Sequence, residues 1–440
     1  MNTPKTSSSP APGISRRAYL RQLAILATAV ATGCRSAAPP AGTLKLSKSD
    51  DAFLEELERA TFRFFDECAH PETGLVKDRS TADACDDRPV ASIAATGFGL
   101  TALCLGDYRG WISHARAREK VLRTLLFLRD RLPHEHGFFF HFIDWRTGER
   151  AWQCELSSID TGLLLCGVLT CRQHFSDAAI QAAADEIYQR VDWLWMAQGE
   201  PLLRHGWKPE TGFLESRWGS YCELMMLYLL AIASTRHPLP PASWKAWKRP
   251  WFDYGRYHYI TDLHAPLFIH QYSHAWYDFR GVRDDFADYF ENSATATAAH
   301  RQFCVNLQSE FPNFGEDLWG ITASDSEKGY TAWGGPPRMG NLDGTVVPCA
   351  PAGSLPFLPK PCLRSLRTMR DRFGDRAWRR YGFVDAFNPG KGWYNPDVIG
   401  IDLGITLLMA ENLRSGFVWQ TFMKNPAARQ GMQRAGFRSG

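Results

Sequence analysis

The 440-residue sequence predicts an all-α fold whose helices form an (α/α)6 barrel, a toroid with short β-hairpins and long loops at its mouth. Hydrophobic residues make up 45% of the chain, which is enough to build a large core. Several helical runs are apolar on nearly every side, as expected for helices buried between neighbours. A turn sequence also recurs at a spacing that suits pairs of helices.

The helices are predicted from capping residues and apolar periodicity. Ser49-Asp50-Asp51 is expected to cap the first helix, in which apolar residues from Phe53 to Phe64 recur at i, i+3 and i+4 spacing. Further helical runs cover residues 92–108, 113–131, 157–174, 177–197, 219–234, 293–309, 354–373 and 398–413. The runs 162–169 and 224–233 are almost wholly apolar, so we expect both to lie in the interior.

A weak internal repeat supports paired helices. The sequence H-P-E-T-G-L-V at 70–76 recurs as K-P-E-T-G-F-L at 208–214, and D-W-R-T-G at 144–148 keeps only the Thr-Gly turn. Each turn leads through a short extended piece into a helical run. A period in the sixties or seventies fits two helices and a turn, and six such units would close a double ring. The alternative is chance, because Pro-Glu-Thr-Gly is a common turn sequence.

The N-terminus predicts export. Ser15-Arg16-Arg17-Ala18-Tyr19-Leu20 resembles a twin-arginine signal, and the apolar run 23–31 is too short to span a membrane. Cys34 ends a sequence that resembles a lipobox, although Ala31 stands where Leu is usual, so a cleaved signal without lipid is the alternative. We expect a signal peptide at 1–34, a linker at 35–48 and one domain at 49–440. The protein would be a monomer of the periplasm or outer membrane that contacts the membrane only through a lipid.

Net charge, motif content and cysteine spacing argue against nucleic-acid-binding, nucleotide-binding and metal-binding functions. The formal net charge is +3 and the basic residues are scattered, so no nucleic-acid partner is expected. Phosphate-binding loops, dinucleotide fingerprints and the GxSxG motif are absent from the sequence. The cysteines show no CxxC spacing, and His264, His270 and His274 lack the spacing of a zinc protease, so no metal or cofactor is expected. Cys68 and Cys85 form the one short-range cysteine pair of interest.

Four acidic residues stand at or near predicted helix starts. Glu155 and Asp160 flank a Ser-Ser cap, where an acid can either complement the helix dipole or face a ligand. Glu223 precedes an almost unbroken apolar run, so burial would raise its pKa as a general acid requires. Asp402 lies in the apolar stretch V-I-G-I-D-L-G-I and is the candidate base. Its rivals are Asp278, Asp325, Asp343 and Glu411.

The second half of the chain combines aromatic rings with acids and amides in loops. A sugar ring needs flat apolar faces that stack and polar groups that bind its hydroxyls, and a glycosidic bond is cleaved by two carboxyl groups. A core role is the alternative for each residue taken singly. The predicted sugar contacts are Glu155, Asp160, His270, His274, Trp276, Asp278, Arg280, Trp319, Asp325, Trp333, Asp343 and Trp393.

Five segments carry a resemblance to a known family. They are C-E-L-S-S-I-D-T (154–161), H-Q-Y-S-H-A-W-Y-D-F-R-G (270–281), W-G-I-T-A-S-D (319–325), D-G-T-V-V-P-C-A-P-A-G-S-L-P-F (343–357) and V-I-G-I-D-L-G-I-T-L-L-M-A-E-N-L-R-S-G (398–416). They resemble the bacterial glucoamylase-like domain family over about residues 50–437. That family includes endo-β-1,2-glucanases and the glucoamylase-like region of cyclic β-1,2-glucan synthases, and it implies an (α/α)6 barrel.

The resemblance implies an anomer-inverting hydrolase, and by position its acid falls on Glu223 and its base on Asp402. We therefore expect an exported β-glucan hydrolase, with endo-β-1,2-glucanase activity as the best guess and an oligo- or polysaccharide as the binding partner. A glucan phosphorylase or transglycosylase is the alternative enzyme, and a noncatalytic glycan-binding lipoprotein is the alternative of another class. An isoprenoid cyclase is disfavoured because the sequence has no DDxxD motif.

Overall fold

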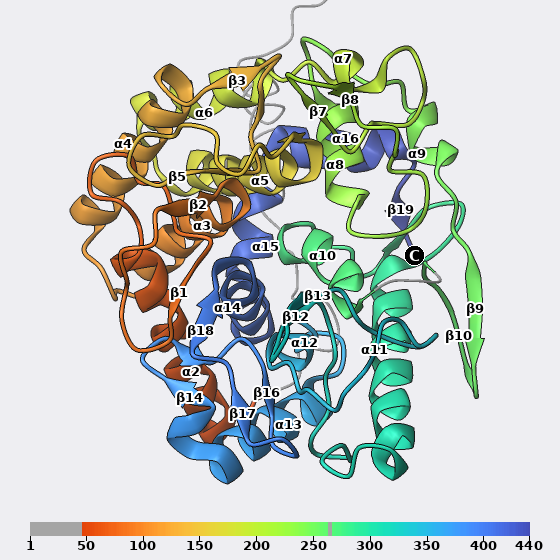
Figure 1. The fold of residues 1–440 in the computed structure, drawn as a ribbon. Coiled ribbons are helices and arrows are strands. Elements are labelled where there is room, and N and C mark those ends of the chain that lie inside the picture. The colour runs from red at the N-terminus through yellow and green to blue at the C-terminus, as the bar shows by residue number, and fades with distance from the viewer. Residues whose placement is uncertain (1–45, 263–265) are drawn as a thin grey trace, which may run out of the picture. The chain divides into compact units, whose positions relative to one another are not determined.

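The computed structural model describes residues 46–262 and 266–440, and this part of the chain is predominantly helical (Figure 1). The long helices are α2 (Lys48–Glu67), α3 (Ile93–Tyr108), α4 (His114–Asp130), α5 (Ser158–His174), α6 (Ala178–Gln189), α11 (Tyr289–Asn306), α13 (Pro359–Phe373) and α14 (Gly400–Arg414). The shorter ones are α7 (Trp193–Ala197), α8 (Met225–Ala233), α9 (Ala242–Ala246), α10 (Tyr272–Trp276), α12 (Cys349–Ala352), α15 (Phe417–Phe422) and α16 (Pro426–Ala435), with 3-10 turns η1 (Leu267–His270), η2 (Leu307–Ser309) and η3 (Gly374–Arg376).

The strands are short and form small antiparallel sheets between the helices. Neighbouring segments pair as β3 (His134–Glu135) with β4 (Phe138–Phe139), β9 (Trp251–Tyr254) with β10 (Tyr257–Ile260), β12 (Ser324–Ser326) with β13 (Gly329–Thr331), β14 (Trp378–Arg379) with β15 (Gly382–Phe383), and β16 (Phe387–Asn388) with β17 (Trp393–Tyr394). Distant segments pair as β1 (Arg79–Thr81) with β18 (Asp397–Ile399), β2 (Val90–Ser92) with β5 (Phe142–Asp144), and β11 (Val282–Arg283) with β19 (Arg438–Ser439). A three-stranded sheet joins β6 (Leu156–Ser157), β7 (Gly206–Lys208) and β8 (Gly212–Phe213).

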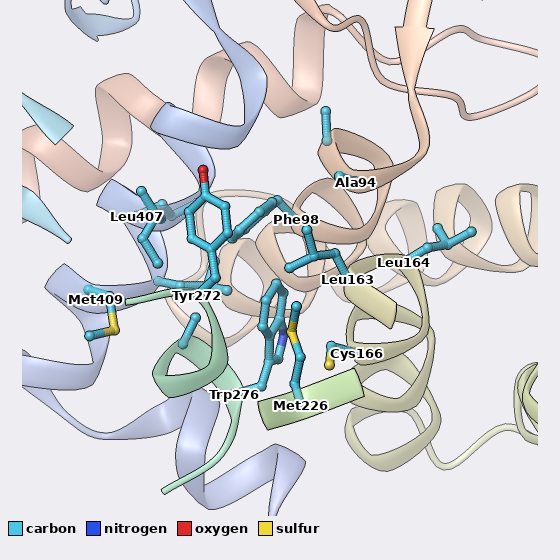
Figure 2. Packing of buried hydrophobic residues seen from close by; sticks show 14 of the residues in the cluster. Ala94, Phe98, Leu163, Leu164, Cys166, Met226, Tyr272, Trp276, Leu407 and Met409 are labelled. Carbon is cyan, nitrogen blue, oxygen red and sulfur yellow. The ribbon is translucent and has the colours of Figure 1, made fainter. Parts of the chain in front are cut away.

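The core lies among helices that come from both ends of the described chain. Helix α3 packs against α5 and α14, α5 also packs against α8, and α14 packs against α10 and α12. Figure 2 shows side chains of α3, α5, α8, α10 and α14 meeting in one apolar cluster around Trp276. Because these helices are covered on several sides, their sequences are apolar nearly all round, as predicted.

Two glycines let α3 and α5 approach each other closely. A Cβ atom on Gly167 would lie 2.1 Å from the carbonyl oxygen of Gly97, and one on Gly97 would lie 2.5 Å from that of Leu163. Both distances are too short for any side chain. The contact between these two helices therefore depends on backbone surfaces that only glycine leaves open.

The predicted helices are found, and five further helices were not predicted. The runs at 92–108, 113–131, 157–174 and 398–413 match α3, α4, α5 and α14 within about two residues. The run at 177–197 is broken into α6 and α7, and that at 219–234 begins as a loop before α8. Helices α9, α10 and α12 were not predicted, because each spans five residues or fewer, and α15 and α16 near the C-terminus were also missed. The cap of α2 is Ser47 rather than Ser49, since the Ser47 hydroxyl accepts a hydrogen bond from the amide of Asp50.

The predicted repeat turns are confirmed as turns. Gly74, Gly148 and Gly212 have φ values of +73°, +79° and +77°, the left-handed region that favours glycine. The chain then runs through short strands into α3, α5 and α8 respectively. Gly392, with φ +68°, makes the same kind of turn before α14, although the sequence comparison did not find it.

The signal peptide at 1–34, its lipidation residue Cys34 and most of the linker lie outside the described residues. Among residues 46–262 and 266–440, none of the helices has the length and apolar character needed to cross a membrane. The ten cysteines of this part of the chain are free thiols. Cys68 and Cys85 are in hydrogen-bonding contact, so the pair singled out from the sequence is a spatial pair.

Candidate active site

Three of the four predicted acids lie where interior helices begin. Asp160 is in the first turn of α5 and Asp402 is in the first turn of α14. Glu223 lies two residues before α8. A short strand leads directly into each of α5 and α14, so Asp160 and Asp402 occupy equivalent positions at the N-terminal ends of these helices.

Glu223 has the environment of a proton donor. Ser273, in α10, holds the backbone of Glu223 in place, because the Ser273 hydroxyl donates a 2.6 Å hydrogen bond to the Glu223 carbonyl. Burial, with smaller contributions from the negative charges of Asp160 and Asp262, raises the pKa of Glu223 from 4.5 to about 7. The carboxyl group therefore holds its proton near neutral pH, as expected from the apolar run that follows it in sequence.

Asp402 shares a proton with a second carboxyl group, that of Asp385. Both side chains are nearly inaccessible to solvent, and a hydrogen bond joins them. Burial and the charge of Asp402 raise the pKa of Asp385 well above its usual range, whereas burial raises that of Asp402 only to about 6. Asp385 is thus the member that keeps the proton, and Asp402 is the member that ionises.

A polar network holds this pair in place. Asp385 Oδ2 accepts hydrogen bonds from the backbone N–H of Asp325 at 2.8 Å and from Asn395 Nδ2 at 3.2 Å. The Asp325 carboxylate in turn accepts from Asn395 Nδ2 at 3.0 Å and pairs with Arg79 at 2.8 Å. The Cys349 thiol, at the start of α12, contacts Asp402 directly. These residues come from five separate parts of the chain.

Tyr272 lies within electrostatic range of both acids. This buried residue is the first of α10, and its ring lies between α3 and α14 in Figure 2. Burial raises the pKa of its hydroxyl, and the charges of both Asp402 and Glu223 raise it further. One hydroxyl that senses both carboxyl groups indicates that Glu223 and Asp402 face the same interior region.

Glu155 and Asp160 are joined by a histidine that the sequence analysis did not identify. His141 Nδ1 lies 3.2 Å from Glu155 Oε1, and His141 Nε2 lies 3.5 Å from Asp160 Oδ1. Burial opposes protonation, but the two carboxylates outweigh it and raise the pKa of His141. Ser157, the N-cap of α5, donates a 2.5 Å hydrogen bond to Asp160 Oδ2. The predicted acids are therefore both brought to this end of α5.

Five predicted sugar contacts are corrected, because the structure buries them. Trp276, His274 and Trp319 have no exposed surface, and His270 and Trp333 are 3% exposed. Four of them make hydrogen bonds inside the protein: Trp276 Nε1 donates to Thr101, Trp333 Nε1 donates to Ser324, His274 Nε2 bonds to Ser293, and His270 bonds to Tyr221. Apolar packing in the core accounts for them without a ligand.

Asp278 and Arg280 lie at the wrong end of the helices for the predicted role. They follow the C-terminal end of α10 and pair with each other at 2.8 Å, and the Arg280 guanidinium stacks on Trp419 of α15 at 4.1 Å. Glu411 is likewise near the C-terminal end of α14, where it pairs with Arg109. The structure therefore does not bring Asp278 and Arg280 to the other predicted acids, and neither Asp278 nor Glu411 remains a rival of Asp402.

Asp343 and Trp393 occupy the loops near β16 and β17. Asp343 pairs with Lys391 at 2.6 Å, and this partner lowers the pKa of Asp343 although burial alone would raise it. Trp393 is half-buried in β17, two residues before Asn395. Both remain predicted sugar contacts, and Asp343 is too strongly paired to serve as the base.

Four residues of this region were missed: Asp385, His141, Tyr330 and Trp152. Tyr330 is 55% exposed on the β12–β13 hairpin. Trp152 is 66% exposed in the loop before Glu155. Only Trp152 carried a usable signal, because it lies three residues before a predicted acid. The others are placed by contacts between distant segments.

The chain is similar in sequence to known proteins. Residues 215–426, which include Glu223, Asp385 and Asp402, match the model of the Glycoamylase family. The chain is 27% identical over 424 residues to an exo beta-1,2-glucooligosaccharide sophorohydrolase (non-reducing end) of Parabacteroides distasonis, a match that covers 88% of this chain and 58% of that protein. The chain thus spans about three fifths of the length of this curated relative.

Solved structures are similar to this chain in overall fold. An endo-beta-1,2-glucanase from Chitinophaga pinensis, in complex with sophorotriose and glucose, superposes with a TM-score of 0.81 at 27% identity, covering 90% of this chain and 99% of that one. A beta-1,2-glucanase from Parabacteroides distasonis superposes with a TM-score of 0.79 at 26% identity, covering 90% of this chain and 61% of the other. The resemblance to the glucoamylase-like family that the sequence indicated is confirmed.

Proposed function

We propose that this chain, which is similar to the glucoamylase-like family, is a glycoside hydrolase that cleaves a β-1,2-linked glucan. Its relatives of known name act on β-1,2-glucans or their oligosaccharides. We further infer an (α/α)6 barrel. The inner helices would be α3, α5, α8, α10, α12 and α14, because they alternate along the chain with α2, α4, α6, α9, α11 and α13, and α14 closes the series by packing on α3.

The observation that carries the proposal is the division of protonation between two acids, one half-buried and one buried, that face one region. With a pKa of about 7, Glu223 is protonated at pH 6.5, whereas Asp402, with a pKa of about 6, is mostly ionised. A glycosidase needs this combination of one acid and one base. Glu223 would protonate the departing glycosidic oxygen, and Asp402 would remove a proton from the attacking water.

The surrounding groups have supporting roles in this mechanism. Protonated Asp385 donates a hydrogen bond to the Asp402 carboxylate and so stabilises the ionised base. Glu155, Asp160 and Asp325 would bind sugar hydroxyls, for which carboxylates are strong acceptors. Inversion of the anomeric centre requires the two catalytic carboxyl groups to be about 6.5–9.5 Å apart, so that a water fits between Asp402 and the sugar.

Endo attack is our first candidate, and exo attack is the second. The Chitinophaga pinensis relative is an endo-beta-1,2-glucanase, which supports the first. The curated Parabacteroides distasonis relative is an exo-acting sophorohydrolase, which supports the second. The two modes differ in their early products: an endo enzyme releases oligosaccharides of mixed length, whereas an exo sophorohydrolase releases a single disaccharide.

Export completes the proposal. The twin-arginine-like segment and Cys34 support delivery of a folded protein to the periplasm or outer membrane with a lipid at Cys34. Labelling cells with a radioactive fatty acid tests this step. A labelled wild type and an unlabelled Cys34→Ala variant are expected, and equal labelling of the two proteins would contradict it.

Product analysis tests the proposed activity. The purified domain is incubated with β-1,2-, β-1,3-, β-1,4-, mixed-linkage and α-1,4-glucans, and Glu223→Gln is run in parallel. We expect short oligosaccharides from β-1,2-glucan alone and their loss in the variant. Products that require phosphate would point to a phosphorylase, and products longer than the substrate would point to a transglycosylase. Binding of glucan without turnover by the wild type would overturn the hydrolase in favour of a glycan-binding lipoprotein.

A further inference from the structure

Trp152 is exposed in a way that burial energetics do not explain. Its indole exposes 66% of its surface, although burying a large aromatic side chain stabilises a fold by about 2 kcal/mol or more. The residue lies in the loop between β5 and β6, which ends at Glu155 and leads into α5. An exposed indole at this place lies near the predicted sugar-binding acids.

The backbone of this loop holds the ring out at a conformational cost. Trp152 and Gln153 are consecutive non-glycine residues with φ values of +53° and +51°. This region is unfavourable for residues with a side chain, and it persists where the surroundings enforce it. The loop is tied at both ends, because the Ala151 N–H donates to the Phe142 carbonyl at 3.0 Å and Arg150 donates to the Cys154 carbonyl at 2.6 Å.

A row of rings connects Trp152 to the acids. The Trp152 ring lies 5.0 Å from that of Phe142, and the Phe142 ring stacks on that of His141 at 3.8 Å. His141 in turn contacts Glu155 and Asp160. Trp152 thus supplies an apolar face at the outer end of a row whose inner end is polar and charged.

We propose that Trp152 is a platform for a glucosyl unit of the glucan chain, at a position distant from the bond that is cleaved. This inference rests on the proposed function, because it names a binding position of the same site. One face of a β-linked glucose ring carries only C–H groups and can stack on indole, while its hydroxyls point to the edges, where Glu155 offers acceptors. The fixed loop conformation presents the indole before the sugar arrives, so little ordering is needed on binding.

The experiment measures both turnover and binding of β-1,2-glucan. Trp152→Ala and Trp152→Phe are compared with wild type for kcat and KM, and with Glu223→Gln as the background for calorimetric Kd values. The control is Tyr108→Ala. This ring is also well exposed, at 51%, and stacks on Phe417 at 4.2 Å, but it ends α3 at the end opposite to the acids.

We expect Trp152→Ala to raise KM and Kd by about tenfold with kcat changed less than about twofold, Trp152→Phe to give a smaller rise, and Tyr108→Ala to give none. Unchanged KM and Kd in Trp152→Ala, while wild type cleaves the glucan, would overturn this proposal and leave the proposed function standing. An equal rise in Tyr108→Ala would also overturn it. A wild type that neither binds nor cleaves β-1,2-glucan would overturn both.

Discussion

Replacing the proposed acid should make the protein more stable at alkaline pH. Glu223 has a pKa of about 7 in the folded protein and about 4.5 when unfolded, because burial disfavours its charged form. A raised carboxyl pKa contributes stability that is fully present below pH 4.5 and is lost as the pH rises through about 7. Glu223→Gln removes this loss, since glutamine does not titrate.

The magnitude follows from the two pKa values. Each unit of difference between the folded and unfolded pKa values is worth 1.36 kcal/mol. The unfolding free energy of wild type should therefore fall by about 3 kcal/mol relative to Glu223→Gln between a pH well below 4.5 and a pH well above 7. Between pH 5 and pH 8.5 about 2.5 kcal/mol of this remains, and because Glu223 is partly exposed this is an upper value. Glu223→Gln would thus gain stability and lose activity, a trade-off that is common at functional sites.

Urea unfolding of both proteins at pH 5 and pH 8.5 measures the difference. Asp343→Asn provides a control that should not respond to this pH change, because Lys391 lowers the pKa of Asp343 despite its burial. A lowered carboxyl pKa contributes stability that is fully present above the unfolded value of 3.8 and is lost only below it, so the difference in unfolding free energy between this variant and wild type should be nearly the same at pH 5 and pH 8.5. A free-energy difference between Glu223→Gln and wild type that is the same at both pH values would refute the assigned environment of Glu223.

Three further predictions concern the site and the core. The rate on β-1,2-glucan should follow a bell-shaped pH profile, rising near pH 6 as Asp402 ionises and falling near pH 7 as Glu223 loses its proton; a flat profile from pH 5 to 8 would contradict these roles. Asp385→Ala should move the rising limb of this profile to higher pH, because the hydrogen bond from Asp385 lowers the pKa of Asp402. Asp385→Asn keeps a hydrogen-bond donor and should move the limb less. Equal shifts in the two variants would exclude a role for the hydrogen bond that Asp385 donates. Trp276→Phe should cost about 1–3 kcal/mol in urea unfolding, through a lost hydrogen bond to Thr101 and a cavity, and leave KM unchanged; a raised KM would restore Trp276 as a sugar contact.

Local rules were sufficient for the features that depend on neighbouring residues in sequence. The periodicity of apolar residues located α3, α5 and α14, because a helix covered on several sides must be apolar around its circumference. The Thr-Gly turns were predicted because the left-handed backbone at Gly74, Gly148 and Gly212 strongly favours glycine. Asp160 and Asp402 were expected at helix starts, where they are found.

The tertiary structure alone decided which aromatic rings are accessible. Trp276 and Trp152 both stand near acids in sequence, yet the first is wholly buried and the second is 66% exposed. Exposure depends on which segments cover a side chain, and those segments are distant in sequence. Helices α10 and α12 were missed for a related reason: each is too short to show a period, and packing against α14 stabilises it.

The charge state of the site was likewise fixed by folding. The sequence determined that Asp402 would be a carboxyl group in apolar surroundings, and so that its pKa would be raised. It did not show that Asp385 would share its proton, because the loop of Asp385 reaches α14 only through the packing of β16, β17 and β18. Desolvation is a local property that composition can predict, whereas the partner of a buried charge is set by which distant segments the fold brings into contact.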